Sequence, residues 1–542
     1  MRRRALSMPV DKATAGDMAV GGAVANPYEN RQAAGCNARL RAAGAAMGRV
    51  IDRGEAMKHQ SVSDRPIGLE ALEARLRYDL RCLNLPAANW VPPVVAPTGE
   101  AVHDVVVVGG GMCGLVGSFA LLAGGIRNIR IFDRSPHGLE GPWMTYARME
   151  TLRSPKTLPG PAFGLGPLTF RAWFEAQFGA VEWQALDKIP RPMWMDYLRW
   201  YRRVLDLPVE NGVEMVRVAP EGRFLRLALR GAPEGSVLAR RLIMATGRDG
   251  TGGPNIPDFV HGLPRERWAH SADEIDFAAL RGKRVAVIGV GASAVDNAAE
   301  ALEHGAAEVR HLIRRREMPT INKMMGIGSY GFTHGYAALD DAWRWRFMHY
   351  SFVTQTPSPR GSTLRVSRHP NAHFHFGAGV RATRMQGDEI LVETARGRLR
   401  TDFLILGTGF RVEALARTEF EGFADKILLW RDVYTPPPEL EHEELGNFPY
   451  VGPDFAFREK EPGTAPWVER IHCFNFGATV SMGKVSGDIP GISEGASWLA
   501  GGIARSLYRE DVERHWQALQ DYSKPELLGD EWRESDWPED ER

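Results

Sequence analysis

The stretch HDVVVVGGGMCGLVGSFALL, from His103 to Leu122, decides the fold. It contains four consecutive valines, Val105 to Val108, a pattern typical of a strand buried on both faces. Gly109, Gly111 and Gly114 follow in the spacing G-x-G-x-x-G, which permits a tight turn, close approach of a pyrophosphate and close helix packing. The stretch therefore predicts a strand, a glycine loop and a helix that together bind a dinucleotide.

A second strand and its final acid strengthen this interpretation. The segment IRIFD ends in Asp133, 24 positions after Gly109. A carboxylate at that place suits the hydroxyls of a ribose. The glycine spacing alone is often only a glycine-rich turn, but strand, helix and acid together favour nucleotide binding.

The same loop occurs a second time, 180 positions further along the chain. Its segment, KRVAVIGVGASAVDNAAEAL, places Gly289, Gly291 and Ala294 in the same spacing, with Ser293 inside the loop. Alanine at the third position still permits close packing of the helix. The chain is therefore predicted to hold two dinucleotides.

The strand after the second loop ends in bases instead of an acid. The segment EVRHLI runs into Arg314, Arg315 and Arg316. Guanidinium groups can pair with a ribose 2′-phosphate and stack on adenine, which predicts an NADP-type dinucleotide there. A solvated basic turn is the alternative. The contrast with Asp133 favours two different dinucleotides.

Composition narrows the class of protein. Lysine plus arginine and aspartate plus glutamate balance at 67 each, whereas a nucleic-acid-binding protein would carry a basic excess. No apolar run reaches the roughly 18 residues of a membrane span. The cysteines have neither metal-ligand nor C-x-x-C spacing, so we expect no metal site and a reducing, cytoplasmic setting. They are Cys36, Cys82, Cys113 and Cys473.

The region before the first loop divides into three parts. Residues 1–60 lack clear periodicity and are expected to form a disordered extension, with Met57 as an alternative start. Leucines at three- and four-residue spacing then predict an amphipathic helix, capped by Asp64 or Ser63. These leucines are Leu69, Leu72, Leu76, Leu80 and Leu83. The segment PAANWVPPVVAPTG is read as a proline linker.

Further motifs accompany the two loops in a fixed order. They are GPW with Trp143, ATG with Thr246, a segment from Ile256 to Gly289 that carries His270, GTG with Thr408, and SGDIPG with Asp488. In this order, from about Asp104 to Tyr508, they resemble the class B flavoprotein monooxygenases. That family comprises flavin-containing monooxygenases, Baeyer–Villiger monooxygenases and N-hydroxylases.

The resemblance implies an α/β fold with two Rossmann-like dinucleotide-binding domains, the NADPH domain inserted in the FAD domain. It also implies that the first loop binds FAD and the second NADPH. Trp143 would lie beside the flavin, with proline replacing the second glycine of the family's Gly-Gly-x-Trp. Thr246 and Thr408 would mark the two crossings between domains, and Asp488 would contact the ribityl chain before a helix from about Ile492.

The implied organisation assigns each part of the chain. Residues 61–100 form the helix and linker, 101–255 and 406–542 the two parts of the FAD domain with the C-terminal tail, and 256–405 the NADPH domain. The aromatic segment Gly326–Val353 shapes a substrate pocket or is a packing helix, and both alternatives stay open.

Two departures from the family bear on the reaction. The Baeyer–Villiger fingerprint places a tryptophan shortly after its histidine, but His270 is followed by SADEIDF, which speaks against conversion of ketones to esters. Arg153 stands where flavin-containing monooxygenases have the asparagine of Asn-x-Pro-Lys, while Pro155 and Lys156 are kept. Arg153, Lys156 and His270 are therefore the catalytic candidates, and a salt bridge is the alternative for Arg153.

The predicted function is an NADPH-dependent flavin monooxygenase that oxygenates a small organic molecule with molecular oxygen through a flavin C4a-(hydro)peroxide. Oxygenation of nitrogen or sulfur is favoured over the Baeyer–Villiger reaction. The alternatives are a reductase that passes electrons from NADPH to a partner or to oxygen, and a non-catalytic flavin-binding protein. A homo-oligomer is left open, and the substrate is not identified.

Overall fold

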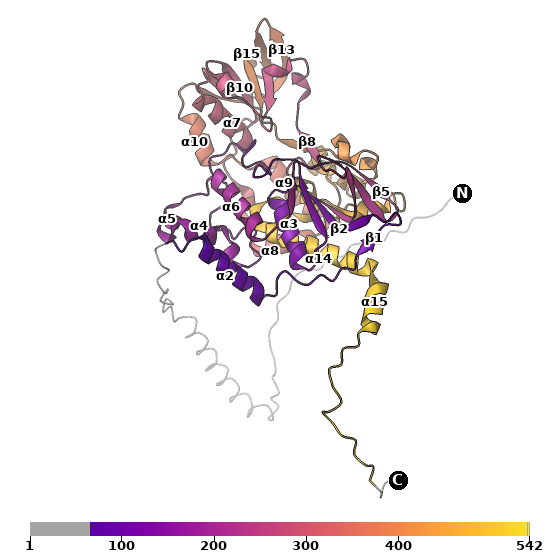
Figure 1. Ribbon diagram of the computed structural model, residues 1–542. Helices are drawn as coiled ribbons and strands as arrows, with labels where there is room; N and C mark the ends of the chain where they lie inside the picture. The colour runs from indigo at the N-terminus through magenta and orange to yellow at the C-terminus, as the bar shows by residue number, and fades with distance from the viewer. Residues whose placement is uncertain (1–65, 539, 541–542) are drawn as a thin grey trace, which may run out of the picture. The chain divides into compact units, whose positions relative to one another are not determined.

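The computed structural model describes residues 66–538 and residue 540 (Figure 1). The predicted N-terminal extension, Met57 and the two proposed caps at positions 63 and 64 lie outside the described residues. The predicted helix near residue 70 is α2, Leu69–Cys82, in which Leu72 and Leu76 are buried. Leu83 lies just past its end and is exposed, so the apolar face is shorter than the leucine spacing predicts.

The first glycine loop lies at the carboxyl end of a strand in an eight-stranded sheet. Six strands follow the order β4-β3-β2-β7-β6-β5. Of the other two, β1 pairs with β2 and β18 pairs with β7. Strands β2, β3, β4, β7 and β18 are mutually parallel where they pair, whereas β5 and β6 run antiparallel. The bounds are β1 Val94–Val95, β2 Ala101–Val108, β3 Ile129–Asp133, β4 Val209–Asn211, β5 Glu214–Glu221, β6 Phe224–Arg230, β7 Ser236–Met244 and β18 Ile471–His472.

The second glycine loop belongs to a five-stranded parallel sheet in the order β12-β11-β10-β16-β9. Its strands are β9 Trp268–His270, β10 Arg284–Ile288, β11 Glu308–Ile313, β12 Ala372–Phe376 and β16 Phe403–Leu406. An antiparallel sheet of β13 Val380–Gln386, β14 Glu389–Thr394 and β15 Gly397–Thr401 accompanies it. Figure 1 shows β10 and α7 (Ala292–Glu303) grouped with β13 and β15, and β2 grouped with α3 (Met112–Ala123) and α14 (Ile492–Glu510).

The chain passes between the two sheets along a pair of short antiparallel strands. The outgoing strand β8, Gly252–Pro254, pairs with the returning strand β17, Phe410–Val412. All strands of the second sheet lie between β8 and β17 in the sequence. The pairing of these two strands holds the outgoing and the returning crossing side by side. This is the inserted arrangement that the sequence predicts, and the predicted fold class is confirmed.

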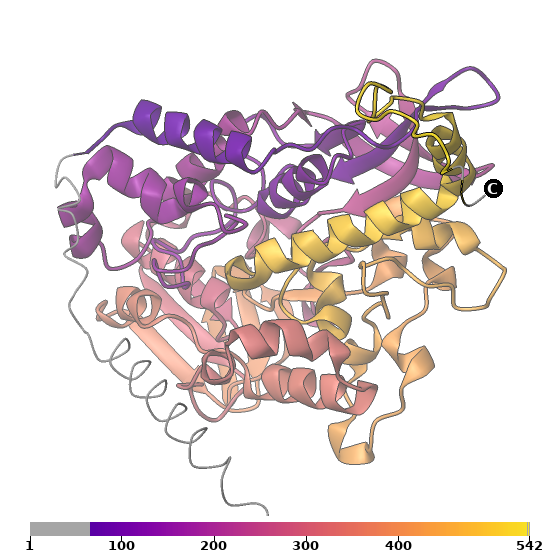
Figure 2. The ribbon, with the colours of Figure 1, turned by 90° about the horizontal axis from the view of Figure 1, so that it is seen from below.

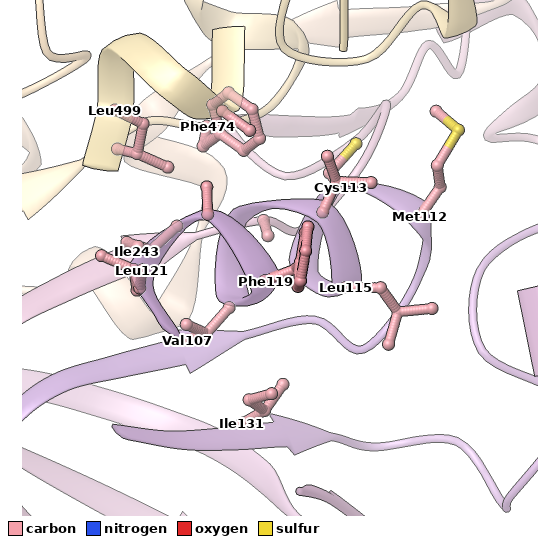
Figure 3. Close-up of a cluster of buried hydrophobic side chains, with 14 of the residues drawn as sticks. Val107, Met112, Cys113, Leu115, Phe119, Leu121, Ile131, Ile243, Phe474 and Leu499 are labelled. Carbon is pink, nitrogen blue, oxygen red and sulfur yellow. The ribbon is translucent and has the colours of Figure 1, made fainter. Parts of the chain in front are cut away.

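Helix α3 packs tightly between the first sheet and helix α14. Ten of its residues are buried, and Figure 3 shows Phe474 and Leu499 facing it from one side and Val107 and Ile131 from the other. Figure 2 shows α14 as a long helix running beside α3 and the first sheet. An apolar helix of this kind has no solvent face, which fits its place between two layers.

The other helices cover the sheets and link the two parts. The α-helices are α3 Met112–Ala123, α4 Phe170–Phe178, α5 Ala180–Ala185, α6 Arg191–Val204, α7 Ala292–Glu303, α8 Tyr330–Gly335, α9 Asp341–Thr354, α10 Arg360–Ser367, α11 Trp430–Val433, α12 Glu443–Gly446, α13 Thr479–Met482, α14 Ile492–Glu510 and α15 Val512–Asp521. The described part of the chain has no helix long and apolar enough to cross a bilayer.

The aromatic segment predicted at 326–353 forms α8 and most of α9. Tyr336, Trp345 and Met348 are buried in one core cluster with Trp430 and Phe448 of the C-terminal part. The Tyr336 hydroxyl donates to the carbonyl of Val480 at 2.8 Å. These buried members favour the packing alternative, and through them the segment joins the second sheet's region to the last part of the chain.

Candidate functional site

The first glycine loop is shaped by contacts that only glycine permits. Gly109 has φ +106°, and a Cβ there would lie 2.4 Å from the carbonyl oxygen of Ala245. A Cβ at Gly114 would lie 1.7 Å from the carbonyl oxygen of Gly109, so helix α3 packs directly on the loop. At Gly111, in contrast, the nearest other protein atom is the Cα of Gly141 at 3.6 Å. The protein thus leaves room in front of Gly111, where a pyrophosphate would approach the start of α3.

Asp133 is buried at the end of β3, and its carboxylate holds the loop. One oxygen accepts from the amide of Gly110 and the other from the amide of Ser135, each at 2.7 Å. Each oxygen keeps further lone pairs, so a ribose can still bind.

A second acid lies nearby, and the sequence did not single it out. A small hollow beside the loop is lined by Gly110, Gly111, His137, Glu140 and Arg202, among others. Buried Glu140 pairs with Arg202 at 2.8 Å and accepts from the side-chain amide of Asn211 at 2.7 Å. In the sequence, only the position of Glu140 directly before the GPW motif could have indicated that it lies near the first loop.

The second loop is built in the same way. Gly289 has φ +122°, and a Cβ there would lie 2.3 Å from the carbonyl oxygen of Gly407. A Cβ at Gly407 would lie 2.3 Å from the Cβ of Ala294, so the alanine in the third position fits because a glycine faces it. Gly291 directly precedes α7, and Ser293 is exposed in the first turn of that helix. The donor-rich helix start suits a phosphate, as at the first loop.

The arginines after β11 have different surroundings. Arg315 donates to the side-chain oxygen of Gln355 at 2.9 Å and to the carbonyl of Val353 at 2.7 Å, which ties it to the end of α9. Arg314 is exposed and makes no hydrogen bond or ion pair within the described part of the chain. Arg316 is likewise exposed and without a hydrogen bond or ion pair to the described residues, so of the three arginines only Arg315 is tied down, and Arg314, the first after β11, has a guanidinium that is free to meet a 2′-phosphate.

The two crossings are held by their own polar contacts. The Thr246 hydroxyl accepts from the Asn475 side chain at 3.2 Å, and the Thr408 hydroxyl donates to the carbonyl of Asn255. His270 Nε2 contacts the carbonyl of Gly409 at 2.9 Å, while its Nδ1 accepts from the amide of Ala272 at 3.1 Å.

These contacts favour a positioning role for His270. Both ring nitrogens have partners, which requires the neutral tautomer protonated at Nε2. Burial lowers the pKa of His270 as well. Its geometry therefore ties β9 to the returning crossing, and its role in catalysis stays a prediction.

Lys156 lies at the end of a helix instead of in an open site. Its ammonium donates to the carbonyls of Trp183, Gln184 and Leu186 at the carboxyl end of α5, and it stands 5.0 Å from the centre of the Trp183 ring. A cation at this position stabilises the helix end. The geometry favours a structural role for Lys156.

Arg153 alone among the three catalytic candidates has a free functional group. Its side chain is exposed and makes no hydrogen bond or ion pair to other described residues. Partial burial lowers its pKa, while the charges of Asp296 and Asp488 act in the opposite direction. The predicted salt bridge is thus not formed in this structure. Asp488 lies just before α14 and 3.9 Å from Lys484, and Trp143 packs edge-on against Trp194.

Comparison with known proteins identifies the family. Residues 106–326 match the pyridine nucleotide-disulphide oxidoreductase family. The chain is 38% identical over 478 residues to the FAD-dependent urate hydroxylase of Xanthomonas campestris pv. campestris, which covers 87% of this chain and 99% of that protein. The chain belongs to the class B flavoprotein monooxygenases. This monooxygenase is therefore an FAD-dependent oxidoreductase, as predicted.

Solved structures agree with the fold. The ornithine hydroxylase of Pseudomonas aeruginosa superposes with a TM-score of 0.59 at 18% identity, covering 75% of this chain and 100% of that chain. The FAD-bound cadaverine monooxygenase of Erwinia amylovora gives 0.56 at 16% identity, covering 74% and 95%. At such identities the likeness concerns the fold alone.

A disulfide reductase would need a redox-active pair of cysteines, and the described part of the monooxygenase contains no such pair. Cys82, Cys113 and Cys473 are all free. Burial raises the pKa of both the Cys113 and the Cys473 thiol to about 12, which keeps them protonated and unreactive.

Proposed function

We propose that this monooxygenase uses NADPH and molecular oxygen to hydroxylate urate or a closely related oxidised purine. The observation that carries the proposal is the 38% identity to a FAD-dependent urate hydroxylase along 99% of that relative. We place the reaction in the cytoplasm, and the number of chains in the enzyme is left open.

The residues on the two loops fit the two cofactors. The open space before Gly111 and the start of α3 would receive the pyrophosphate of FAD, and Asp133 or Glu140 its ribose. The loop of Gly289 and Gly291 would hold NADPH, with Arg314 at the 2′-phosphate. Bound FAD would supply the redox chemistry, in which the two electrons of NADPH and one molecule of O2 give one oxygen atom to the substrate and one to water.

The chain's own side chains then orient the reactants and exclude water. Trp143, Thr246, Thr408 and Asp488 are proposed to line the flavin, and His270 to fix the crossing beside it. Arg153 is proposed to contact the substrate, because its guanidinium is free and an oxidised purine such as urate carries negative charge at neutral pH.

Oxygenation of an amine or a sulfide, which the sequence favours, is the competing reaction. The solved relatives that act on amines share only 16–18% identity with this chain, too little to indicate a substrate. The urate proposal therefore has the better support.

Substrate-dependent oxygen consumption by the FAD-loaded protein tests the proposal. Urate should accelerate NADPH oxidation and disappear in equal amounts with NADPH and O2, with little hydrogen peroxide formed. Ornithine, lysine, cadaverine and a thioether should not. Acceleration by an amine alone would replace urate by that class. NADPH oxidation that yields only peroxide with every compound would favour the reductase alternative.

A further inference from the structure

Arg248 is a cation that none of the predicted site motifs includes. It follows Gly247, the last residue of the outgoing crossing motif, and its guanidinium carbon lies 3.9 Å from the centre of the Phe476 ring. Its side chain makes no hydrogen bond or ion pair within residues 66–538. It keeps access to solvent, yet surrounding protein desolvates it enough to lower its pKa. Arg248 is thus exposed, with one face of its guanidinium covered by the Phe476 ring.

The backbone on both sides of this stack is held by hydrogen bonds. The amide of Phe476 donates to the carbonyl of Gly247 at 3.3 Å. The neighbouring Asn475 side chain donates to the carbonyl of Met244 and to the Thr246 hydroxyl, each at 3.2 Å. With one face of the guanidinium on a fixed aromatic ring, its N–H edge stays available for a planar anion.

The charges around this point are unbalanced. Asp488 lies close enough for its charge to act on both Arg248 and Arg153, and it also faces Lys484 at 3.9 Å. A further acid near Arg248 is Glu444, whose pKa is raised by burial towards the neutral form. Asp296, whose charge acts on Arg153, likewise has its pKa raised by burial. Neither arginine forms an ion pair within the described residues, so two free guanidinium groups are available to attract an anionic ligand.

We propose that Arg248 and Arg153 together bind the negative charge of the substrate, a planar heterocyclic anion of the urate kind, beside the flavin. This inference rests on the proposed function for the identity of the anion. Arg248 is assigned a specificity-determining role: it selects an anion and orients its edge, while Phe476 keeps the guanidinium in place. A phosphate of FAD or of NADPH is the competing partner, and the experiment separates the three.

The experiment measures urate binding without turnover. Oxidised, FAD-loaded protein is titrated with urate in the absence of NADPH, and the shift of the flavin spectrum gives the dissociation constant. Arg248→Ala should weaken binding about ten- to a hundredfold, the value of one charge-assisted hydrogen bond. Arg248→Lys should restore only part of it, because an ammonium lacks the planar fork. Arg230→Ala is the control, because it removes an exposed cation of β6 that pairs with Glu214 of β5. This variant should bind urate as the parent does.

Three further measurements identify which anion Arg248 binds. FAD content and the rate of flavin reduction by NADPH without urate should be unchanged in Arg248→Ala. A fully methylated, uncharged xanthine should bind equally to parent and variant. Loss of FAD would assign Arg248 to the flavin, and slow reduction with intact urate binding would assign it to NADPH. Either result overturns the inference.

Measuring urate binding and urate turnover separately distinguishes failure of the Arg248 inference from failure of the proposed function. If the parent hydroxylates urate but Arg248→Ala binds it equally well, the inference is wrong and the proposed function stands. If urate binds in an Arg248-dependent way without being oxygenated, the anion site stands and the proposed function fails. A parent that does not bind urate overturns both.

Discussion

Single residues in the two glycine loops determine where each loop leaves room for a ligand. At Gly111 the protein itself leaves room for a side chain, since the nearest other atom to an added Cβ is 3.6 Å away. The requirement for glycine there comes from the ligand, whereas at Gly109 and Gly114 it comes from the protein's own backbone. Substitution at Gly111 can therefore separate cofactor binding from folding.

Gly111→Val is expected to fold but to lose FAD, because its side chain would occupy the place of the pyrophosphate. The ratio of flavin to protein after purification, together with a melting curve, measures this. Gly262→Val is the matched control. An added Cβ at Gly262 meets no atom within 4 Å, and this glycine is far from the first loop in the sequence. A yellow Gly111→Val protein with the parent's flavin content would place FAD elsewhere.

Arg314 should set the preference for NADPH over NADH. Arg314→Ala is expected to lower that preference about ten- to a hundredfold, because one charge-assisted contact with the 2′-phosphate is worth about 1.5–3 kcal/mol. Arg315→Ala should have a smaller effect, since its guanidinium already binds Gln355 and Val353. Comparing kcat/KM for both coenzymes checks this, with Arg384→Ala, an exposed partner of Glu393, as the control. A parent without a preference rejects the assignment.

At the scale of elements, sequence patterns predicted what is local. The strands at 129–133 and 308–313 begin and end where the patterns placed them, because hydrophobic runs and glycines act within a few residues. The helix that the family resemblance implied from about Ile492 begins at that residue. β2 starts at Ala101, earlier than the valine run indicates, because its first residues pair with β1 and β7. Arg248 was missed for a related reason: its stack on Phe476 joins residues more than 200 positions apart.

Lys156 also shows that a sequence motif does not reveal long-range contacts. Its motif suggested a catalytic role, whereas its contacts suggest that it stabilises the end of α5. Lys156→Ala is expected to destabilise the fold by about 1–2 kcal/mol through loss of the cation at the helix end. Urate hydroxylation per folded, FAD-loaded molecule should persist. Thermal melts and coupled oxygen uptake measure the two effects, and Lys524→Ala in the exposed tail is the control. Lost coupling with an unchanged melting temperature would restore Lys156 to the chemistry.

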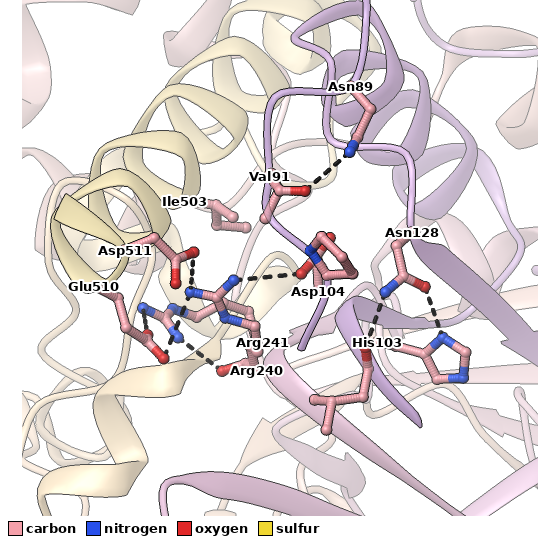
Figure 4. Close-up of polar contacts among 12 residues, drawn as sticks. Asn89, Val91, His103, Asp104, Asn128, Arg240, Arg241, Ile503, Glu510 and Asp511 are labelled. Atoms are coloured by element: carbon pink, nitrogen blue, oxygen red, sulfur yellow. Dashed lines mark hydrogen bonds and ion pairs between the residues drawn. The ribbon is translucent and has the colours of Figure 1, made fainter. Parts of the chain in front are cut away.

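Across the whole molecule, a buried ion cluster joins the start of the first sheet to the end of the last long helix (Figure 4). Arg240 of β7 pairs with Asp104 of β2 at 3.4 Å and with Asp511 at 2.7 Å, and all three are buried. Arg241 pairs with Glu510 at 2.9 Å. The members are up to 407 positions apart, so no sequence window could predict the cluster. Two of its acids, Glu510 and Asp511, lie at the junction of α14 and α15.

Arg240→Met should cost about 3–5 kcal/mol, because it leaves Asp104 and Asp511 buried without their cation. The loss should depend on pH. Burial raises the pKa of Asp104 to about 6, so this carboxyl is charged in the folded protein above that pH and neutral below it. Without Arg240 the charged form is the costly one, and the destabilisation should be larger at pH 8 than at pH 5. Urea unfolding midpoints at both pH values measure this, with Arg230→Met on the surface expected to change stability by less than about 0.5 kcal/mol. An equal loss at both pH values would show that packing of the arginine stem, and not its charge, holds the two ends together.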